Sequence, residues 1–331
     1  MTGLLESAYN QEQIALFEEL ICLPTKYRQC NGPVRNLAYL TALHVHTIST
    51  IPYENLSLHY SKSRLVELDP QLLFEKLVTG GRGRGGYCME VSILMNHVLR
   101  ALGFQAYMTG VRIRLRKDGV PSGDYIGWTH MVSLVGFPDR THYMMDVAFG
   151  GDGATKPIPL KHAQALQNLG TQEVRLVRDY LANQVLRTEA SKLWIYQYRN
   201  GPAKQWNSFY AFSEQEFLEA DFKVMNWYTS TSPDSFQRFC PLVVKFLRKR
   251  ETLDDGAEGD EEIVGKRMLV GSVLKENLGG KTRVVKDCQD ESDRVKALED
   301  WFGIHLNTEE KAGIEGHWTE IGRKAAKSSV P

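Results

Sequence analysis

The spacing of apolar residues changes near residue 105, and this change most limits the folds that the chain can adopt. Before it, apolar side chains recur every three or four residues, as on one face of a helix, for example between residues 91 and 102. After it, between residues 111 and 116, apolar residues alternate with arginines, as on a strand with one solvated face. The two periods predict an α+β fold, with a helical bundle first and an antiparallel sheet or small β-barrel after it.

The same patterns divide the 331-residue chain into three expected domains. Residues 1–105 are expected to form the helical bundle, residues 106–212 the β-barrel, and residues 213–331 a mixed α/β domain. Helices are expected at 14–21, 34–43, 73–78 and 91–102, and strands at 111–115, 130–135, 142–149 and 193–198.

The third domain has weaker local signals. A capping box at residues 213–216 is expected to open a helix, and Ser292 to cap the final one. Strands are expected at 242–247 and 268–273. Between them, residues 251–262 carry seven acidic side chains and almost no apolar ones, so a solvated acidic loop, inserted into this domain, is expected there.

Charge and cysteine content exclude several functions. The 40 basic and 40 acidic side chains cancel, so the chain lacks the broad positive field that nucleic-acid binding normally needs. The sequence contains no run of 18 apolar residues, so no membrane span is predicted. The five cysteines are scattered and never form a Cys-x-x-Cys pair, which argues against a disulfide framework and a tetrathiolate zinc site and favours a cytoplasmic protein.

The most unusual segment runs from Gly81 to Glu90 and has four glycines in its first six residues. Cys88 follows them, at the start of a strongly amphipathic helix, where backbone N–H groups and the helix dipole favour a thiolate. The glycines also satisfy G-x-G-x-x-G, but a dinucleotide-binding loop needs a strand before it and residues 71–78 are expected to be helical. A buried, inert thiol remains the plainer interpretation of a lone cysteine.

Two residues that lie beyond residue 105, where the apolar spacing changes, support a catalytic role for Cys88. His130 begins an expected strand, and Asp146 interrupts the apolar run 143–149, where an unpaired buried acid would cost several kcal/mol. A hairpin would bring the two side chains together. A nucleophilic cysteine needs an imidazole to take its proton and a carboxylate to orient that imidazole, so Cys88, His130 and Asp146 are a candidate triad. No metal site is expected.

These residues resemble the arylamine N-acetyltransferase family. Its nucleophile signature, Arg-Gly-Gly-aromatic-Cys followed by an apolar residue and Glu or Gln, matches residues 84–90. Its Thr-His pair matches residues 129–130, and its Asp-x-x-Phe-Gly matches residues 146–150. Its Pro-aromatic-Glu-Asn-Leu segment is similar to residues 52–56, and its Thr-Ser-Pro element to residues 231–233.

The resemblance implies a fold of helical bundle, β-barrel and C-terminal α/β lid, with a core like that of papain-like cysteine enzymes. It implies that Phe149 lies against an aromatic acceptor and that Gly127 and Thr231 lie near coenzyme A. It also implies an ion pair between Arg84 and Glu54. The family often has Asn four residues after the cysteine, where this chain has Ser92.

The implied reaction is ping-pong transfer of an acetyl or malonyl group, through an acyl-cysteine, to arylamines, arylhydrazines or N-hydroxyarylamines. Acyl-coenzyme A is then the donor substrate, and no permanently bound cofactor is expected. Two alternatives stay open from the residues: a cysteine hydrolase or transglutaminase-like enzyme with the same Cys-His-Asp order, and a catalytically inactive relative that acts as a binding protein.

Overall fold

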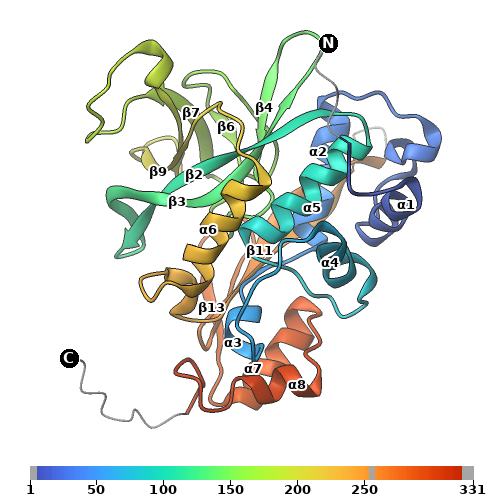
Figure 1. Cartoon of the computed structure of the whole chain (residues 1–331), viewed down its shortest axis with the longest axis vertical. Helices are drawn as coiled ribbons and strands as arrows, with labels where there is room; N and C mark the ends of the chain where they lie inside the picture. Colours follow the sequence, from blue (N-terminus) through green and yellow to red (C-terminus); the bar gives the residue numbers. More distant parts are fainter. Residues whose placement is uncertain (1–5, 253–257, 323–331) are drawn as a thin grey trace.

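The computed structural model describes residues 6–252 and 258–322. Its N-terminal part is helical, as expected, and lies on one side of the molecule (Figure 1). Asn10 and Asn36 cap the first two α-helices through their side chains. The helix that begins at Cys88 ends before Gly103, which has a positive φ of 81°. The helices are α1 (Gln11–Leu20), α2 (Leu37–Thr50), α3 (Ser57–Tyr60), α4 (Pro70–Phe74), which continues as a π-helical turn (Glu75–Thr79), and α5 (Cys88–Ala101).

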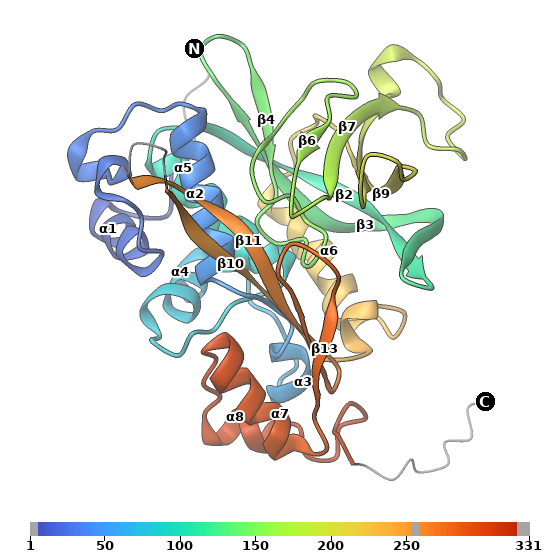
Figure 2. The same ribbon diagram turned by 180° about the vertical axis from the view of Figure 1, so that it is seen from behind.

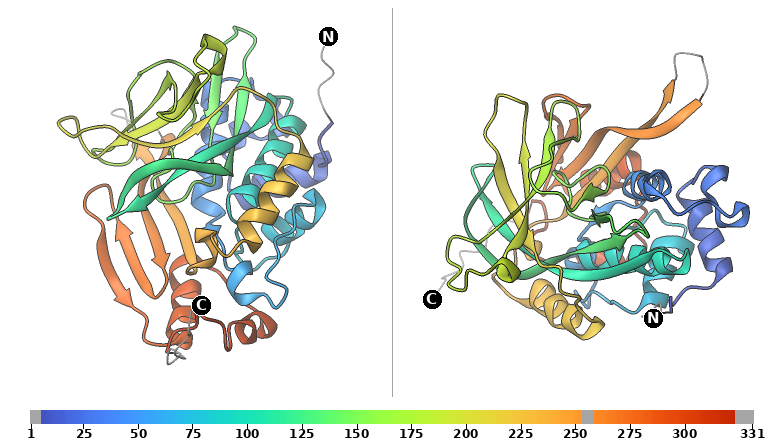
Figure 3. Two further views of the ribbon diagram at one scale, coloured as in Figure 1. Left: turned by 60° about the vertical axis from the view of Figure 1, so that its left-hand side comes forward. Right: turned by 90° about the horizontal axis from the view of Figure 1, so that it is seen from above.

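An antiparallel sheet of eight strands follows, in the order β5-β4-β3-β2-β9-β8-β7-β6. A bridge between His162 and Leu176 brings the two ends of the sheet together, so the sheet is a nearly closed barrel (Figure 3). Its interior is aromatic, with Tyr196 and Tyr210 stacked 4.5 Å apart. The strands are β2 (Gln105–Lys117), β3 (Val120–Gly136), β4 (His142–Met145), β5 (Ile158–Pro159), β6 (Leu166–Gln167), β7 (Glu173–Asp179), β8 (Leu193–Arg199) and β9 (Asn207–Phe212).

The second sheet joins the N-terminal part of the chain to the C-terminal part, in the order β1-β10-β11-β12-β13. Helix α2 packs against β10 and β11, which run as a long hairpin (Figure 2). Helix α6 packs against β3 of the barrel. The elements are β1 (Tyr53–Glu54), β10 (Leu242–Thr252), β11 (Glu258–Val270), β12 (Val273–Asn277), β13 (Arg283–Asp287), α6 (Glu219–Thr231), α7 (Glu291–Ala297), a π-helical turn (Leu298–Phe302) and α8 (Thr308–Gly313).

Two expected helix starts are wrong. Residues 213–216 do not open a helix: the Phe217 N–H donates to the carbonyl of Met108 in β2, which holds this segment extended, and α6 begins at Glu219. Ser292 lies inside α7, whose cap is Asp290, because the Asp290 side chain accepts from the Asp293 N–H. Nor is α7 the last helix, since α8 follows it.

The acidic segment 251–262 is less of a loop than expected. Strand β10 extends to Thr252 and β11 starts at Glu258, while residues 253–257 lie outside the described part of the chain. Pairing across the hairpin sets Arg250 opposite Glu261, and opposite charges on facing strands stabilise such a pair. Acidic residues here therefore complement the basic partner strand. Within the two described ranges, no helix has the length and apolar character that crossing a membrane requires.

Candidate active site

Cys88 is the first residue of α5, at the end of the glycine-rich segment. The glycines allow close backbone contacts: a Cβ on Gly85 would lie 1.7 Å from the carbonyl oxygen of Pro52, and one on Gly83 would lie 1.9 Å from that of Gly303. The thiol is buried, with the Cys88 Sγ 3.7 Å from the carbonyl oxygen of Thr129 in β3. The helix start therefore presents the sulfur directly to the barrel.

His130 follows Thr129 in β3, and its side chain meets that of Asp146, which comes directly after the neighbouring strand β4. The His130 Nε2 lies 2.9 Å from the Asp146 Oδ2, and both side chains are buried. Burial by itself would lower the pKa of the imidazole. The charge and hydrogen bond of Asp146, with a smaller contribution from a hydrogen bond to Cys88, outweigh it and raise the pKa of His130 to about 10. The imidazole is therefore held as an imidazolium at neutral pH.

Asp146 lies just beyond the strand that was expected to contain it. Strand β4 ends at Met145, and the chain turns so that the Asp146 Oδ1 accepts from the backbone N–H of Ala148, 3.2 Å away. This leaves the Oδ2 for His130. The buried acid in an apolar run has the imidazole partner that its position predicted.

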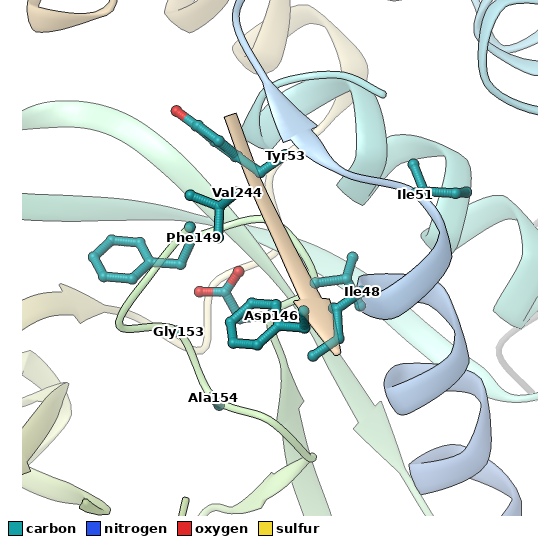
Figure 4. A pocket seen from close by; sticks show the side chains of 11 residues that line it. Ile48, Ile51, Tyr53, Asp146, Phe149, Gly153, Ala154 and Val244 are labelled. Carbon is teal, nitrogen blue, oxygen red and sulfur yellow. The ribbon is translucent and has the colours of Figure 1, made fainter. Parts of the chain in front are cut away.

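A small pocket adjoins this pair (Figure 4). Tyr53, Asp146 and Phe149 contribute to its wall, and most of the other lining side chains are aliphatic. The Phe149 ring lies 5.1 Å from the His130 ring and packs edge-on against Phe209. The wall of the pocket beside the His130–Asp146 pair is therefore mostly apolar.

The Arg84–Glu54 ion pair, expected from the resemblance, is present beneath the glycine-rich segment. The Arg84 Nε lies 2.8 Å from the Glu54 Oε1, and both side chains are buried. Burial raises the pKa of Glu54, but the cations Arg84 and Lys76 outweigh it and lower the pKa. Lys76 also lies 2.7 Å from Glu90, whose other oxygen accepts from the Tyr87 N–H. These buried charges fix the turn that leads into α5.

Sequence reasoning missed the contribution of the C-terminal helix. Glu310 in α8 forms ion pairs with both Arg84 and Arg82. The His305 N–H also donates to the carbonyl of Arg82, 2.9 Å away. No local pattern marks Glu310, because its partners lie more than 220 residues earlier in the chain. The glycine-rich segment is thus held from both ends of the chain.

The other expected site residues, Gly127 and Thr231, lie on β3 and at the end of α6. Gly127 is exposed on β3, and a Cβ there would meet open space. Thr231 ends α6, where its Oγ1 donates to the carbonyl of Trp227 and its carbonyl accepts from Arg238. Contact of either residue with coenzyme A therefore stays a prediction.

Two further observations concern polar side chains near Cys88. The Ser92 Oγ is buried and has no hydrogen-bond partner among the residues that the structure describes. His44 is buried behind Asp146 and binds the carbonyl of Ala154, and burial lowers its pKa to about 4. Among the residues that the structure describes, no three histidine, cysteine or acidic side chains cluster as metal ligands would.

Comparison with known proteins identifies similar sequences along most of the chain. The sequence pattern of the N-acetyltransferase family matches residues 36–311. The chain is 32% identical to the N-malonyltransferase FDB2 of Fusarium pseudograminearum, in an alignment that covers 92% of each protein. It is also 32% identical to the arylamine N-acetyltransferase of Mycobacterium tuberculosis, over 63% of this chain and 67% of that protein.

The fold is similar to that of solved structures as well. The arylamine N-acetyltransferase from Salmonella typhimurium superposes with a TM-score of 0.72 at 25% identity, covering 92% of this chain and 98% of the other. The α+β arrangement of helices and barrel is therefore the one that the sequence predicted.

Proposed function

The chain belongs to the arylamine N-acetyltransferase family and is an acyl-coenzyme A-dependent N-acyltransferase, and we propose that Cys88 carries the acyl group during transfer. The observation that supports this role is the 2.9 Å contact between His130 and Asp146 beside a buried thiol at a helix start. An imidazolium held by a buried carboxylate stabilises a neighbouring thiolate.

In the proposed first half-reaction, the Cys88 thiolate attacks the carbonyl carbon of the donor thioester. A carbon–sulfur bond forms and the π electron pair moves onto the oxygen. This pair then re-forms the carbonyl and expels coenzyme A, whose sulfur takes the proton from the His130 imidazolium. The products are an acyl-cysteine, free coenzyme A and a neutral imidazole.

In the second half-reaction, an arylamine, arylhydrazine or N-hydroxyarylamine attacks the acyl-cysteine. Neutral His130 takes the proton that the amine loses, and the Cys88 thiolate leaves, which restores the starting pair. Asp146 keeps its charge throughout and holds the ring in one orientation. Phe149 offers an apolar surface for the aromatic ring of the acceptor.

Malonyl-coenzyme A is the proposed preferred donor, with acetyl-coenzyme A as the alternative. The relative that aligns with this chain along 92% of both lengths is named an N-malonyltransferase, whereas the arylamine N-acetyltransferase of Mycobacterium tuberculosis aligns over about two thirds. Single-turnover acylation with both donors side by side tests this preference. A higher acylation rate with acetyl-coenzyme A would reverse it.

The test of Cys88 is the mass of the intact protein after donor addition. The wild-type chain gains one acyl group, and Cys88→Ala gains none. Cys30→Ala is the matched control, because that thiol is exposed whereas Cys88 is buried, and its variant is expected to become acylated like the wild type. An acyl adduct that persists in Cys88→Ala would refute the assignment.

The same experiment separates the alternatives. A hydrolase loses its acyl group to water at a similar rate with or without an arylamine, whereas the transferase releases it mainly to the amine. An inactive relative forms no adduct at all. Because the five cysteines are scattered, a cytoplasmic location is also proposed, and cell fractionation tests it.

A further inference from the structure

Tyr53 lies beside the segment that leads to Cys88, yet the reaction as described gives it no part. It belongs to β1, pairs with Val244 of β10, and forms a bridge with Gly86, two residues before the nucleophile. Its ring lines the pocket together with Asp146 (Figure 4). The ring of Tyr53 therefore forms part of the pocket wall beside Asp146, and its backbone pairs with the segment that leads to Cys88.

Hydrogen bonds assign the donor and the acceptor in the contact between Tyr53 and Gln237. The Leu242 N–H donates to the Asn55 Oδ1 over 2.7 Å, so the Asn55 Nδ2 is the donor end of that amide. This Nδ2 donates to the carbonyl of Gln237 over 2.8 Å and lies 3.4 Å from the Gln237 Oε1. The Oε1 is thus the acceptor end of Gln237, and its Nε2 donates to the Tyr53 oxygen over 2.6 Å.

The Tyr53 hydroxyl is therefore an acceptor toward Gln237 and keeps its own hydrogen for another partner. Among the residues that the structure describes, no acceptor for that hydrogen is found. Asn55 and Gln237 are each only 2% exposed, so solvent does not compete for their amide groups. The side-chain amides of Asn55 and Gln237 therefore hold the Tyr53 oxygen in place, and the hydroxyl hydrogen stays available for a hydrogen bond.

We propose that the Tyr53 hydroxyl donates a hydrogen bond to the carbonyl oxygen of the acyl group as that oxygen becomes negative. This inference rests on the proposed acyl transfer through Cys88. The backbone N–H groups at the start of α5 supply the other donors, because the first N–H groups of a helix have no partner within it. Tyr53 keeps its proton throughout, and no bond to it forms or breaks.

The surroundings of the phenol agree with this role. Burial, and after it the negative charge of a Cys88 thiolate, raise the pKa of Tyr53 well above its usual value. The hydroxyl therefore stays protonated over the whole working range of pH.

Tyr53→Phe removes only the hydroxyl. We expect it to slow acylation of Cys88 about 10- to 100-fold at saturating donor, because a donor to the oxyanion acts mainly in the transition state. The KM for the donor and the melting temperature are expected to change little. The measurement is single-turnover adduct formation by intact mass, with acetyl- and malonyl-coenzyme A.

Two further variants separate this role from a structural one. Gln237→Met keeps the volume but frees the hydroxyl to rotate, so it is expected to slow acylation by a smaller factor. Tyr198→Phe removes a hydroxyl from a buried tyrosine of the barrel and is expected to acylate at the wild-type rate. Slowing of Tyr53→Phe that appears only as a higher KM would contradict the inference.

The donors distinguish the remaining outcomes. Equal slowing with acetyl and malonyl donors supports contact with the carbonyl, which both share, whereas slowing with malonyl alone would assign the hydroxyl to the free carboxylate and overturn the inference. A wild-type acylation rate in Tyr53→Phe overturns it too, and leaves the proposed function intact. Failure of the wild-type chain to form any adduct overturns both.

Discussion

At the scale of single residues, the proposed mechanism depends on one charge that the sequence places in an apolar run. Asp146 costs free energy if it is unpaired, and its 2.9 Å contact with His130 shows how that cost is met. The contact also keeps a proton on His130 where burial alone would remove it. A single carboxylate thus determines the protonation state of the site.

Asp146→Asn tests this dependence. Without the charge, burial lowers the pKa of His130 below its ordinary value, so the imidazolium is lost at a lower pH and acylation at neutral pH falls about 10²- to 10⁴-fold. The alkaline limb of the pH–rate profile moves toward acid. Single-turnover acylation between pH 5 and 10 measures both effects.

Asp139→Asn is the control for this prediction, because that carboxylate lies on an exposed turn and accepts hydrogen bonds from Thr141. An unchanged alkaline limb in Asp146→Asn would contradict the assignment. The His130–Asp146 pair also affects stability. Because its pKa is raised on folding, His130 stabilises the fold fully below about pH 6.5, and this contribution is lost as the pH rises through about 10.

At the scale of elements, the apolar periods predicted most helices and strands but not their ends. Phe17 and Leu99 are fully buried on the expected faces of α1 and α5, whereas Val34 is 74% exposed and precedes α2. The apolar spacing places the start of this helix too early, because Asn36 caps it and α2 begins at Leu37. Ends depend on caps and on distant hydrogen bonds, such as that of Phe217 to Met108, which no local pattern contains.

The residues of the candidate site also differ in how far the sequence could predict them. Cys88, His130 and Asp146 could be found from the sequence because each is chemically out of place in its own segment. Tyr53 stood within a recognised motif, but its fixed hydroxyl depends on Gln237, 184 residues later. Glu310 in α8 had no signal at all, since a glutamate near the start of an exposed helix is ordinary.

Helix α8 gives the prediction at this scale. Glu310→Gln removes the negative partner of Arg82 and Arg84 and is expected to destabilise the protein by about 1–3 kcal/mol, because the Arg84 charge is buried. Acylation of Cys88 is expected to slow as well, since the glycine-rich segment loses a brace. Urea unfolding and single-turnover acylation measure these effects.

Glu309→Gln is a control one residue away. Its carboxylate is 72% exposed and lies 3.8 Å from an equally exposed Lys62, so its loss changes stability by less than about 1 kcal/mol. Equal behaviour of the two variants would show that α8 does not brace the site through Glu310.

At the scale of the whole molecule, one partly buried carboxylate connects the barrel to the C-terminal sheet. Asp152, six residues after Asp146, pairs with Arg116 of β2 and with Lys266 of β11, whose Nζ lies 3.3 Å away. Lys266 is 5% exposed. Burial opposes ionisation of Asp152, but the two cations outweigh it and lower its pKa to about 2.

Asp152→Asn leaves the Lys266 ammonium buried without a counter-charge, and we expect a loss of about 3 kcal/mol at pH 7. Because the pKa is lowered on folding, the stabilisation is present above about pH 4 and is lost as the pH falls through about 2. The difference between wild type and variant in urea unfolding therefore shrinks toward pH 2. A constant difference would assign the loss to packing instead.

The close contact between Gly83 and Gly303, with Glu310 beyond it, has a consequence for how the protein is made. A ribosome completes Cys88, His130, Asp146 and the ion pair of Arg84 with Glu54 early, but the C-terminal residues that also hold the glycine-rich segment come last. A nascent chain therefore lacks these C-terminal contacts until its synthesis is almost finished. We expect ribosome-bound chains stopped at residue 302 to acylate no faster than an ordinary cysteine, so that reactivity arises only with the nearly complete chain.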